Sequence, residues 1–577
     1  MRNPPIALWA ALLAFPLLAQ ADEDSPPPSR FNEATVAELQ AQMAAGRLTS
    51  VELTNFYLQR IKQLDENGPR LNSIIELNPD ALTMAAAADA ERRRGVVRGP
   101  LHGMPVLLKD NIDTGDRMQT TAGSLALAGL PAVQDSTIAA RLRASGAVIL
   151  GKTNLSEWAN FRSFFSTSGW SGRGGLTHNP YSLDRNACGS SSGSAAAVSA
   201  NLAAVSLGSE TDGSIVCPAN ANGVVGLKPT VGLTSRAGVV PISHVQDTVG
   251  PHTRTVADAA ALLSVIQSRT FDGRDPATDG VPLGWRGRSR PTNIPADYAQ
   301  FLDANGLRGA RIGITRQGLD NGPPQVVAAF DAAIAAMEGA GAMIVDLDAA
   351  GFTFPSADGE FLVLLYDFKV DVQKYFASRV GVPMAGKTLA DAIAFDEAHA
   401  AAEMPFFFQE IFGLAQQIDT SSPDAPQPVF GGMTYNQALD IDQNAGVNGI
   451  DLALSKYSLD AVVAPTEPPA WTTDLISSDH FIFGSSGLAA APGYPIVQVP
   501  SGVVLGMPLG ISFFGTAFSE PTLIRLASGF EAATHARVPP KFAPSLPVSN
   551  PGVPLAPPKR GEHKGERKDH GKRPHRM

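Results

Sequence analysis

Short apolar runs alternate with helix-like periodic segments along most of the chain. Over 35–66, apolar side chains recur at spacings of three and four residues, which predicts two amphipathic helices. The apolar run at 105–109 then has the length of a buried strand. Residues 136–154 show a helical pattern, a glycine stop and a second apolar strand, and 194–209 repeat this order. Because the alternation continues over 307–469, the pattern predicts an α/β protein with a largely buried sheet.

Both ends of the chain depart from this pattern. Arg2 is followed by an apolar stretch over 6–18 and by small residues before Ala21, which is typical of a secretory signal peptide. The stretch is shorter than the roughly 20 apolar residues that a membrane span needs, so we expect an exported protein, periplasmic or secreted, without a membrane anchor. The final residues are rich in Pro, then in Lys, Arg and His, which predicts disorder. The expected division is a signal peptide (1–21), a linker (22–31), one folded domain (32–542) and a disordered basic tail (543–577).

The overall composition narrows the possible functions. With a net charge of −10 over 577 residues, the chain lacks the basic character that a nucleic acid partner requires. It contains no H-E-x-x-H, Walker or G-x-G-x-x-G motif, so we expect neither a metal nor another cofactor. Cys188 and Cys217 are the only cysteines. A single bridge between them is possible in an oxidising compartment, but two small, unbridged, buried side chains are the favoured interpretation.

Two serine-bearing, glycine-flanked loops lie close together in the sequence, GSSSGS at 189–194 and TDGSI at 211–215. The first contains a G-x-S-x-G match centred on Ser191, the nucleophile elbow of α/β-hydrolase esterases. That motif requires a strand immediately before it, whereas residues 177–188 are polar and rich in turn formers. An esterase triad also needs a histidine base. The esterase is therefore disfavoured and is kept only as an alternative interpretation.

Lys109 offers a different kind of base. It ends the apolar run that begins at Pro105, so its stem should be buried and its amine should lie at a strand end, where α/β proteins place their sites. Burial lowers the pKa of a lysine, and a neutral amine can accept a proton. A lysine followed by an aspartate is more often a surface ion pair, so its importance depends on the residues that accompany it.

The sequence resembles the amidase signature family in four ordered blocks, GPLHGMPVLLKDNID, CGSSSGSAAAV, GSETDGSIVCP and QDTVGP. The resemblance spans about residues 32–542 and is closest to bacterial peptide amidases. It implies an amidase-signature fold, a central mixed β-sheet covered on both faces by helices, and a Ser-cisSer-Lys triad. The triad residues would be Ser214 as nucleophile, Ser190 as bridging serine after a cis peptide bond, and Lys109 as base. The chain departs from the commoner pattern by having CGSSSGS in place of GGSSGGS, and Asp212 in place of Gly.

The residues of the second loop suit the chemistry of amide cleavage. An amide needs an activated nucleophile, hydrogen-bond donors for its oxyanion and a proton for its leaving nitrogen. Gly213 permits tight backbone curvature before Ser214, so we expect the N–H groups of Thr211, Asp212 and Gly213 to form an oxyanion hole.

By resemblance, the expected activity is hydrolysis of a linear carboxamide, the C-terminal amide of a peptide, to acid and ammonia through an acyl-enzyme. The segment NLSEWANFRS resembles a pocket-lining block of the family, which implies that Phe161 and Arg162 bind substrate, although core packing is an equally good interpretation for Phe161. The expected partner is a small-molecule or short peptide amide substrate, with no obligate subunit. One alternative is the glutamine-hydrolysing component of a tRNA amidotransferase, which the export signal disfavours. A catalytically inactive binding protein is another, which the intact triad disfavours.

Overall fold

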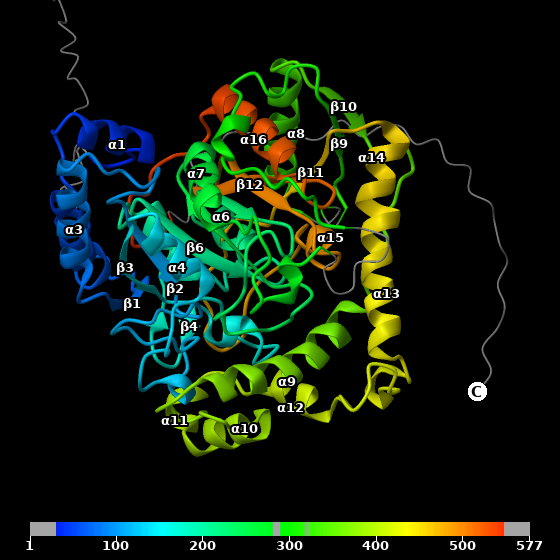
Figure 1. Ribbon diagram of the computed structural model, residues 1–577. Coiled ribbons are helices and arrows are strands. Elements are labelled where there is room, and N and C mark those ends of the chain that lie inside the picture. The colour runs from blue at the N-terminus through cyan, green and yellow to red at the C-terminus, as the bar shows by residue number, and fades with distance from the viewer. Residues whose placement is uncertain (1–30, 281–288, 318, 320–321, 547–577) are drawn as a thin grey trace, which may run out of the picture.

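The computed structural model describes residues 31–280, 289–317, 319 and 322–546 (Figure 1). The expected signal peptide, residues 22–30 of the linker and residues 547–577 of the tail lie outside the described residues, so these assignments stay predictions. Near the C-terminal end, the C=O of Ala543 accepts a hydrogen bond from the N–H of Leu183 at 2.9 Å, and Leu546 packs against an apolar cluster. Contacts with the folded domain therefore continue beyond the boundary expected at residue 542.

One mixed sheet of 11 strands forms the centre of the described part of the chain. In spatial order its strands are β1 (Ile74–Leu77), β3 (Val148–Thr153), β2 (Pro105–Lys109), β6 (Val205–Glu210), β8 (Thr248–Thr253), β7 (Val225–Lys228), β12 (Ile496–Val504), β13 (Met507–Phe514), β11 (Ala461–Pro465), β9 (Arg311–Ile314) and β10 (Met343–Asp346). Strands β3, β2 and β6 are parallel to one another, as are β11, β9 and β10, and the strands between these groups pair antiparallel. A small separate sheet pairs β4 (Trp170–Ser171) with β5 (Gly175–Leu176).

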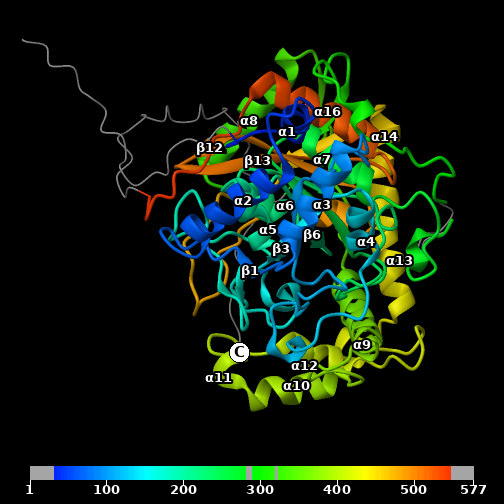
Figure 2. The ribbon, with the colours of Figure 1, turned by 60° about the vertical axis from the view of Figure 1, so that its left-hand side comes forward.

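Helices surround the central sheet, and those of the N-terminal region lie in front of it in the turned view (Figure 2). The helices around the sheet are α1 (Val36–Ala44), α2 (Ser50–Arg60), α3 (Ala81–Arg93), α4 (Thr137–Ala144), α5 (Ser192–Ser199), α6 (Val216–Ala221), α7 (Val256–Ile266), α8 (Pro324–Gly339), α14 (Leu452–Tyr457), α15 (Gly487–Ala490) and α16 (Glu520–Thr534). A second group comprises α9 (Glu360–Ser378), α10 (Leu389–Ala398), α11 (Ala400–Glu403) and α12 (Glu410–Gln417) at the bottom of Figure 1, and α13 (Tyr435–Gly446), which runs along its right-hand side. None of these described helices is long and apolar enough to cross a bilayer.

Both faces of the central strands are covered. Every residue of β2, β3, β6 and β8 is buried. Because successive side chains of a strand point to opposite faces, burial of all of them requires cover on both sides. The largest apolar cluster joins side chains of these strands to those of α4, α7 and α16, among them Leu107, Leu142, Leu263 and Leu526. The predicted α/β fold, with a mixed sheet covered by helices, is confirmed.

Segments with clear sequence patterns fold into the expected elements. The periodic segment at 35–66 forms α1 and α2, and each of these helices begins with a capping box. Thr35 Oγ1 accepts the N–H of Glu38 at 3.2 Å, and the Glu38 carboxylate accepts the N–H of Thr35 at 2.9 Å. Thr49 and Glu52 repeat this arrangement before α2. Such caps satisfy N–H groups that the first helical turn leaves without partners.

The α9–α13 group covers the edge of the sheet at which β2, β3 and β6 end. Its apolar side chains, such as Phe368 and Phe412, cluster with Trp158 and Phe161 from the loop that follows β3, and with Ile242 from the loop before β8. Parallel strands end at a common edge, where α/β proteins place their sites. Residues that follow these strands therefore lie between the sheet and this helical layer.

We predict that Leu526→Ala destabilises the fold without altering the chemistry of any site at that edge. Leu526 is fully buried on α16, which packs on β12, α7 and α8. Truncation of a buried leucine removes apolar contacts and leaves a cavity, which costs about 3 kcal/mol of unfolding free energy. Denaturant unfolding should show this loss. A change below about 1 kcal/mol would contradict the buried position of this side chain.

Candidate active site

Lys109 ends β2, and its amine is buried at the edge of the sheet. The side chain is fully buried, and its Nζ lies 2.7 Å from Ser190 Oγ. Two further contacts hold the amine, to Ser209 Oγ at 3.0 Å and to the C=O of Ser209 at 3.1 Å. Asn111 Nδ2 in turn donates to Ser209 Oγ at 2.8 Å. The amine therefore has a fixed position next to the hydroxyl of Ser190.

Burial lowers the pKa of Lys109 to about 7, because the interior solvates an ammonium ion poorly. The negative charges of Asp247 and Glu210 act in the opposite direction and keep this pKa from falling further. A substantial fraction of the protein therefore has a neutral amine at this position near pH 7.

Ser190 lies on the loop that leads into α5, directly after a cis peptide bond with Gly189, as the resemblance implied. Its C=O accepts the N–H of Ser156 at 3.0 Å. The next residue, Ser191, donates its N–H to the C=O of Ser214 at 3.2 Å. The two serine loops that are close in the sequence are therefore in direct contact.

Ser214 lies between β6 and α6, after a glycine in the left-handed region. Gly213 has φ of 77°, which glycine adopts without strain. The carboxylate of Glu210 accepts the N–H of Ile215 at 2.6 Å and that of Val216 at 3.0 Å, and so fixes the backbone after Ser214. Thr211 Oγ1 donates to Asp247 at 2.6 Å and fixes the backbone before it.

The backbone donors expected for an oxyanion hole are available. Among the described residues, the N–H groups of Thr211, Asp212 and Gly213 have no hydrogen-bond acceptor. All three residues line the same cavity as Ser214. The structure therefore leaves several donors near this serine for a group that enters from the cavity, as an oxyanion hole requires.

The cavity has a volume of about 330 Å³ and is open to solvent on one side. Its lining residues are Ala159, Asn160, Phe161, Ser168, Cys188, Gly189, Thr211, Asp212, Gly213, Ser214, Cys217, Ile242, Leu364, Glu467, Trp471, Asp479, Phe481 and Ser486. The acidic side chains among them are Asp212, Glu467 and Asp479, and burial raises the pKa of each. None of the described lining residues is basic, so the cavity offers backbone N–H donors, hydroxyl and carboxyl groups and apolar surface, but no cationic side chain.

Of the two residues expected to bind substrate, only Phe161 reaches the cavity. Its ring lies against that of Phe368 from α9, with 5.2 Å between centroids. Arg162 is not among the described lining residues. It is fully buried, with its guanidinium in an ion pair with Glu157 at 2.5 Å and 4.7 Å from the ring of Phe407. Its assignment to substrate binding stays a prediction.

The structure does not support the nucleophile-elbow alternative at Ser191. Its hydroxyl is fully buried, donates to the C=O of Ser209 at 3.0 Å and accepts the N–H of Ser209 at 3.2 Å. No histidine in the described part of the chain hydrogen bonds to Ser191 or Ser214. The buried imidazole of His252 contacts the C=O of Ile215 at 3.0 Å, and burial lowers its pKa to about 3. Ser191 therefore helps to hold the Lys109 side of the site.

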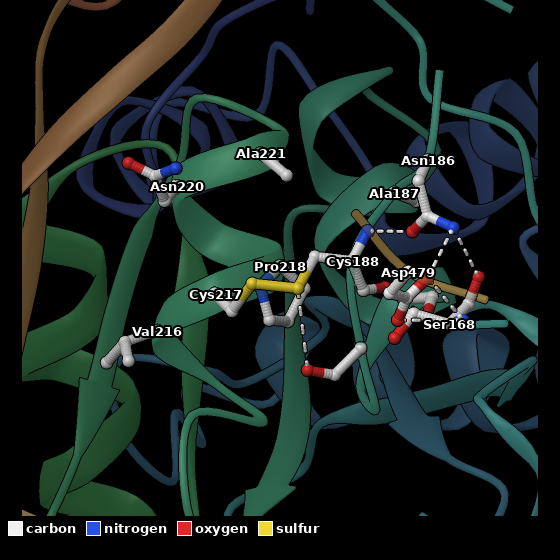
Figure 3. Close-up of a disulfide and its surroundings, with 12 residues drawn as sticks. Ser168, Asn186, Ala187, Cys188, Val216, Cys217, Pro218, Asn220, Ala221 and Asp479 are labelled. Atoms are coloured by element: carbon white, nitrogen blue, oxygen red, sulfur yellow. Dashed lines mark hydrogen bonds between the residues drawn. A yellow bond between two sulfur atoms is a disulfide. The ribbon is translucent and has the colours of Figure 1, made fainter. Parts of the chain in front are cut away.

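Several residues of the site were not predicted from the sequence. Ser209, Asn111 and Asp247 support Lys109 or the loop of Ser214, and no local pattern distinguishes them from other polar residues. The favoured interpretation of the cysteines was also wrong, because Cys188 and Cys217 form a disulfide with 5.9 Å between their Cα atoms (Figure 3). The position of each cysteine beside one serine loop was the signal for this pairing.

Comparison with known proteins shows which family this chain resembles. The sequence profile described as Amidase matches residues 52–524. A probable amidase of Arabidopsis thaliana is 42% identical over 525 residues, covering 89% of this chain and 92% of the relative. The crystal structure of peptide amidase from Stenotrophomonas maltophilia is 48% identical with a TM-score of 0.79, covering 89% of this chain and 100% of that one. A glutamyl-tRNA(Gln) amidotransferase subunit of Chloroflexus aurantiacus is 33% identical and covers 88% of this chain and 98% of the relative.

The profile covers most of the chain and includes the positions of Lys109, Ser190 and Ser214. The structure also brings Lys109 and Ser190 into hydrogen-bond contact. The chain therefore belongs to the amidase signature family of hydrolases, which act on amides.

Proposed function

We propose that this protein hydrolyses the C-terminal amide of short peptides to a free acid and ammonia. The observation that carries the proposal is the buried contact of 2.7 Å between Lys109 Nζ and Ser190 Oγ, beside a cavity that Ser214 lines. The likeness to the peptide amidase of Stenotrophomonas maltophilia supports this choice of substrate. We further propose export through the N-terminal signal and activity without an obligate subunit.

The contacts of Lys109 favour one direction of proton transfer. A neutral amine has two N–H donors and one lone pair. The C=O of Ser209 can only accept, and Ser209 Oγ lies within reach as a second acceptor. If both donors point to Ser209, the lone pair faces Ser190 Oγ and can accept the proton of that hydroxyl.

The reaction then proceeds through two linked proton transfers. Ser214 Oγ attacks the amide carbon while its proton passes to Ser190, and the Ser190 proton passes to Lys109. The backbone N–H groups at 211–213 stabilise the negative oxygen of the tetrahedral intermediate. Return of a proton by the same relay expels ammonia and leaves an acyl-enzyme on Ser214. Water then attacks the carbonyl carbon of the acyl-enzyme while the relay takes its proton. The ester bond breaks, Ser214 Oγ regains a proton, and the acid is released.

The lining of the cavity suits an amide substrate better than its acid product. The carboxyl groups of Asp212, Glu467 and Asp479 can accept N–H donors, which an amide has and a carboxylate lacks. Since none of the described lining residues is basic, a carboxylate formed in the cavity gains no ion pair. A volume of about 330 Å³ lies at the lower end of ligand sites, as expected for the end of a short peptide.

Substitution of three serines and of Lys109 should separate the proposed relay from the nucleophile-elbow alternative. Ser214→Ala should lower kcat by about 10³-fold or more, and Ser190→Ala should be similarly severe, because the relay works as a unit. Lys109→Arg should be inactive because a guanidinium stays protonated near neutral pH. Ser191→Ala should stay within about tenfold of the wild type, since it loses only a support for Ser209. Ammonia release measures each rate, and a more severe loss in Ser191→Ala than in Ser214→Ala would contradict the assignment.

The pH dependence should follow the protonation of Lys109. The base must be neutral and its pKa is about 7, so kcat/KM should be constant above that value and fall as the pH decreases through it. Far below the pKa, the decrease should approach about tenfold per pH unit. Initial rates between pH 5 and 9 with an uncharged peptide amide test this expectation. A rate that stays constant down to pH 5 would exclude a lysine base with this pKa.

The proposed substrate is tested with a panel of peptide amides, free amino-acid amides and glutamine. The protein starting near Asp22 should release ammonia from a peptide amide without ATP or an added subunit. Mass spectrometry should show a gain of about one mass unit, because an amide becomes an acid while the peptide stays intact. Internal peptide fragments, or activity only with glutamine and a second protein, would refute the proposed function.

A further inference from the structure

A disulfide joins the two serine loops of the site. Cys188 precedes Ser190 by two residues, and Cys217 follows Ser214 by three. Both cysteines are buried, and both line the cavity beside Ser214. Figure 3 shows the bridge running from the loop of Cys188 to the first turn of α6. The covalent link thus connects the hydroxyl of the relay to the nucleophile through very short lengths of chain.

The loop on the Cys188 side is held in an unusual backbone conformation. Cys188 has φ of 54°, a left-handed conformation that costs free energy for any residue with a Cβ. Asn186 Oδ1 accepts the N–H of Cys188 at 2.6 Å, and Asn186 Nδ2 donates to the C=O of Ser168 at 3.0 Å and to Asp479 at 3.3 Å (Figure 3). A glycine would adopt this φ with less strain, but it could not provide the crosslink.

On the other side, Cys217 is tied to the backbone of the nucleophile. Its N–H donates to the C=O of Gly213 at 2.8 Å, so Cys217 and Ser214 share one tight turn. Within the described part of the chain, a single hydrogen bond joins segments 186–191 and 211–218 directly, from Ser191 N–H to Ser214 C=O at 3.2 Å. The disulfide is thus the strongest direct connection between the two segments.

We propose that the Cys188–Cys217 disulfide is a positioning element of the relay, which holds Ser190 within proton-transfer distance of Ser214 and makes full activity depend on the oxidised protein. This inference rests on the proposed function, because it assumes that Ser190 and Ser214 act together. Hydrogen-bonded proton transfer is sensitive to distance, and a misplacement of about 1 Å can cost a hundredfold in rate. The cysteines touch the relay through the backbone and take no part in the chemistry.

Reduction of the bridge gives a chemically balanced test. Dithiothreitol supplies two electrons and two protons, the Cys188–Cys217 bond breaks to two thiols, and the reagent becomes its cyclic disulfide. This treatment keeps both sulfur atoms in the wall of the cavity. A loss of rate after reduction therefore reports on the link between the loops rather than on the shape of the lining.

The experiment compares reduced wild-type protein with C188G, C217A and the C188G/C217A double variant. C188G removes the crosslink and gives position 188 a residue that adopts this φ without strain, so folding is favoured. L526A serves as the control, because it destabilises the fold away from the serine loops. For each protein, ammonia release from one peptide amide at 25 °C gives kcat and KM, thermal unfolding gives Tm, and titration of thiols after denaturation reports the redox state.

The expected result is a kcat at least tenfold lower in the two single variants, in the double variant and in the reduced wild type. KM should change by less than about threefold in the reduced wild type, because the cavity keeps its atoms. Reductant should leave the double variant unchanged, and L526A should lose Tm while keeping kcat.

The opposite pattern would overturn the inference. If C188G, C217A and the reduced protein lose Tm but keep kcat within twofold of the oxidised wild type, the bridge only stabilises the fold. Wild-type protein that releases no ammonia from any amide would instead refute the proposed function. The two failures are therefore distinguished by the activity of the oxidised wild type.

Discussion

The site depends on the burial of one amine. Lys109 ends a strand whose five residues are all buried, so its charged form loses most of its hydration. The cost of desolvation moves the pKa of this lysine to about 7, where an ordinary lysine would be fully protonated. The large mixed sheet, with helices on both faces, is what allows a polar group to be placed this deeply. The lowered pKa of Lys109 is therefore a consequence of the fold rather than of a neighbouring charge.

Burial makes hydrogen bonding around the amine obligatory, and this requirement organises the neighbouring segments. Ser209 contacts the amine with its hydroxyl and its C=O, and Asn111 and Ser191 hold Ser209 in place. The loop of Ser214 is fixed by a different set of groups, in which Glu210 binds the backbone after the serine. These contacts leave the backbone N–H groups at 211–213 without acceptors, so they can respond to a substrate. The loop of Ser214 is thus held in a fixed position while its backbone N–H groups remain available to a substrate.

Local sequence patterns predicted the fold closely but only part of the site. The strand at Pro105–Lys109 and the helices over 35–66 are determined by residues that are close together in the sequence. The hydrophobic pattern was therefore enough to predict them. The supports of Lys109 could not be predicted, because Ser209 becomes significant only through its contact with a lysine 100 positions away. The surroundings of Arg162 could not be predicted either, because Phe407, whose ring lies 4.7 Å from its guanidinium, is far away in the sequence. The cysteines were placed correctly beside the serine loops, but their pairing required the distance between the loops.

The central claim, that Lys109 is buried and has a pKa low enough to leave a substantial neutral fraction near pH 7, can be tested without any substrate. Lysines labelled with ¹³C at Cε can be titrated by NMR, and comparison with a Lys109→Met protein assigns the signal of Lys109. The account predicts that this signal titrates with a pKa of about 7. A Lys109 signal that titrates near 10, the value of an unperturbed lysine, would contradict it.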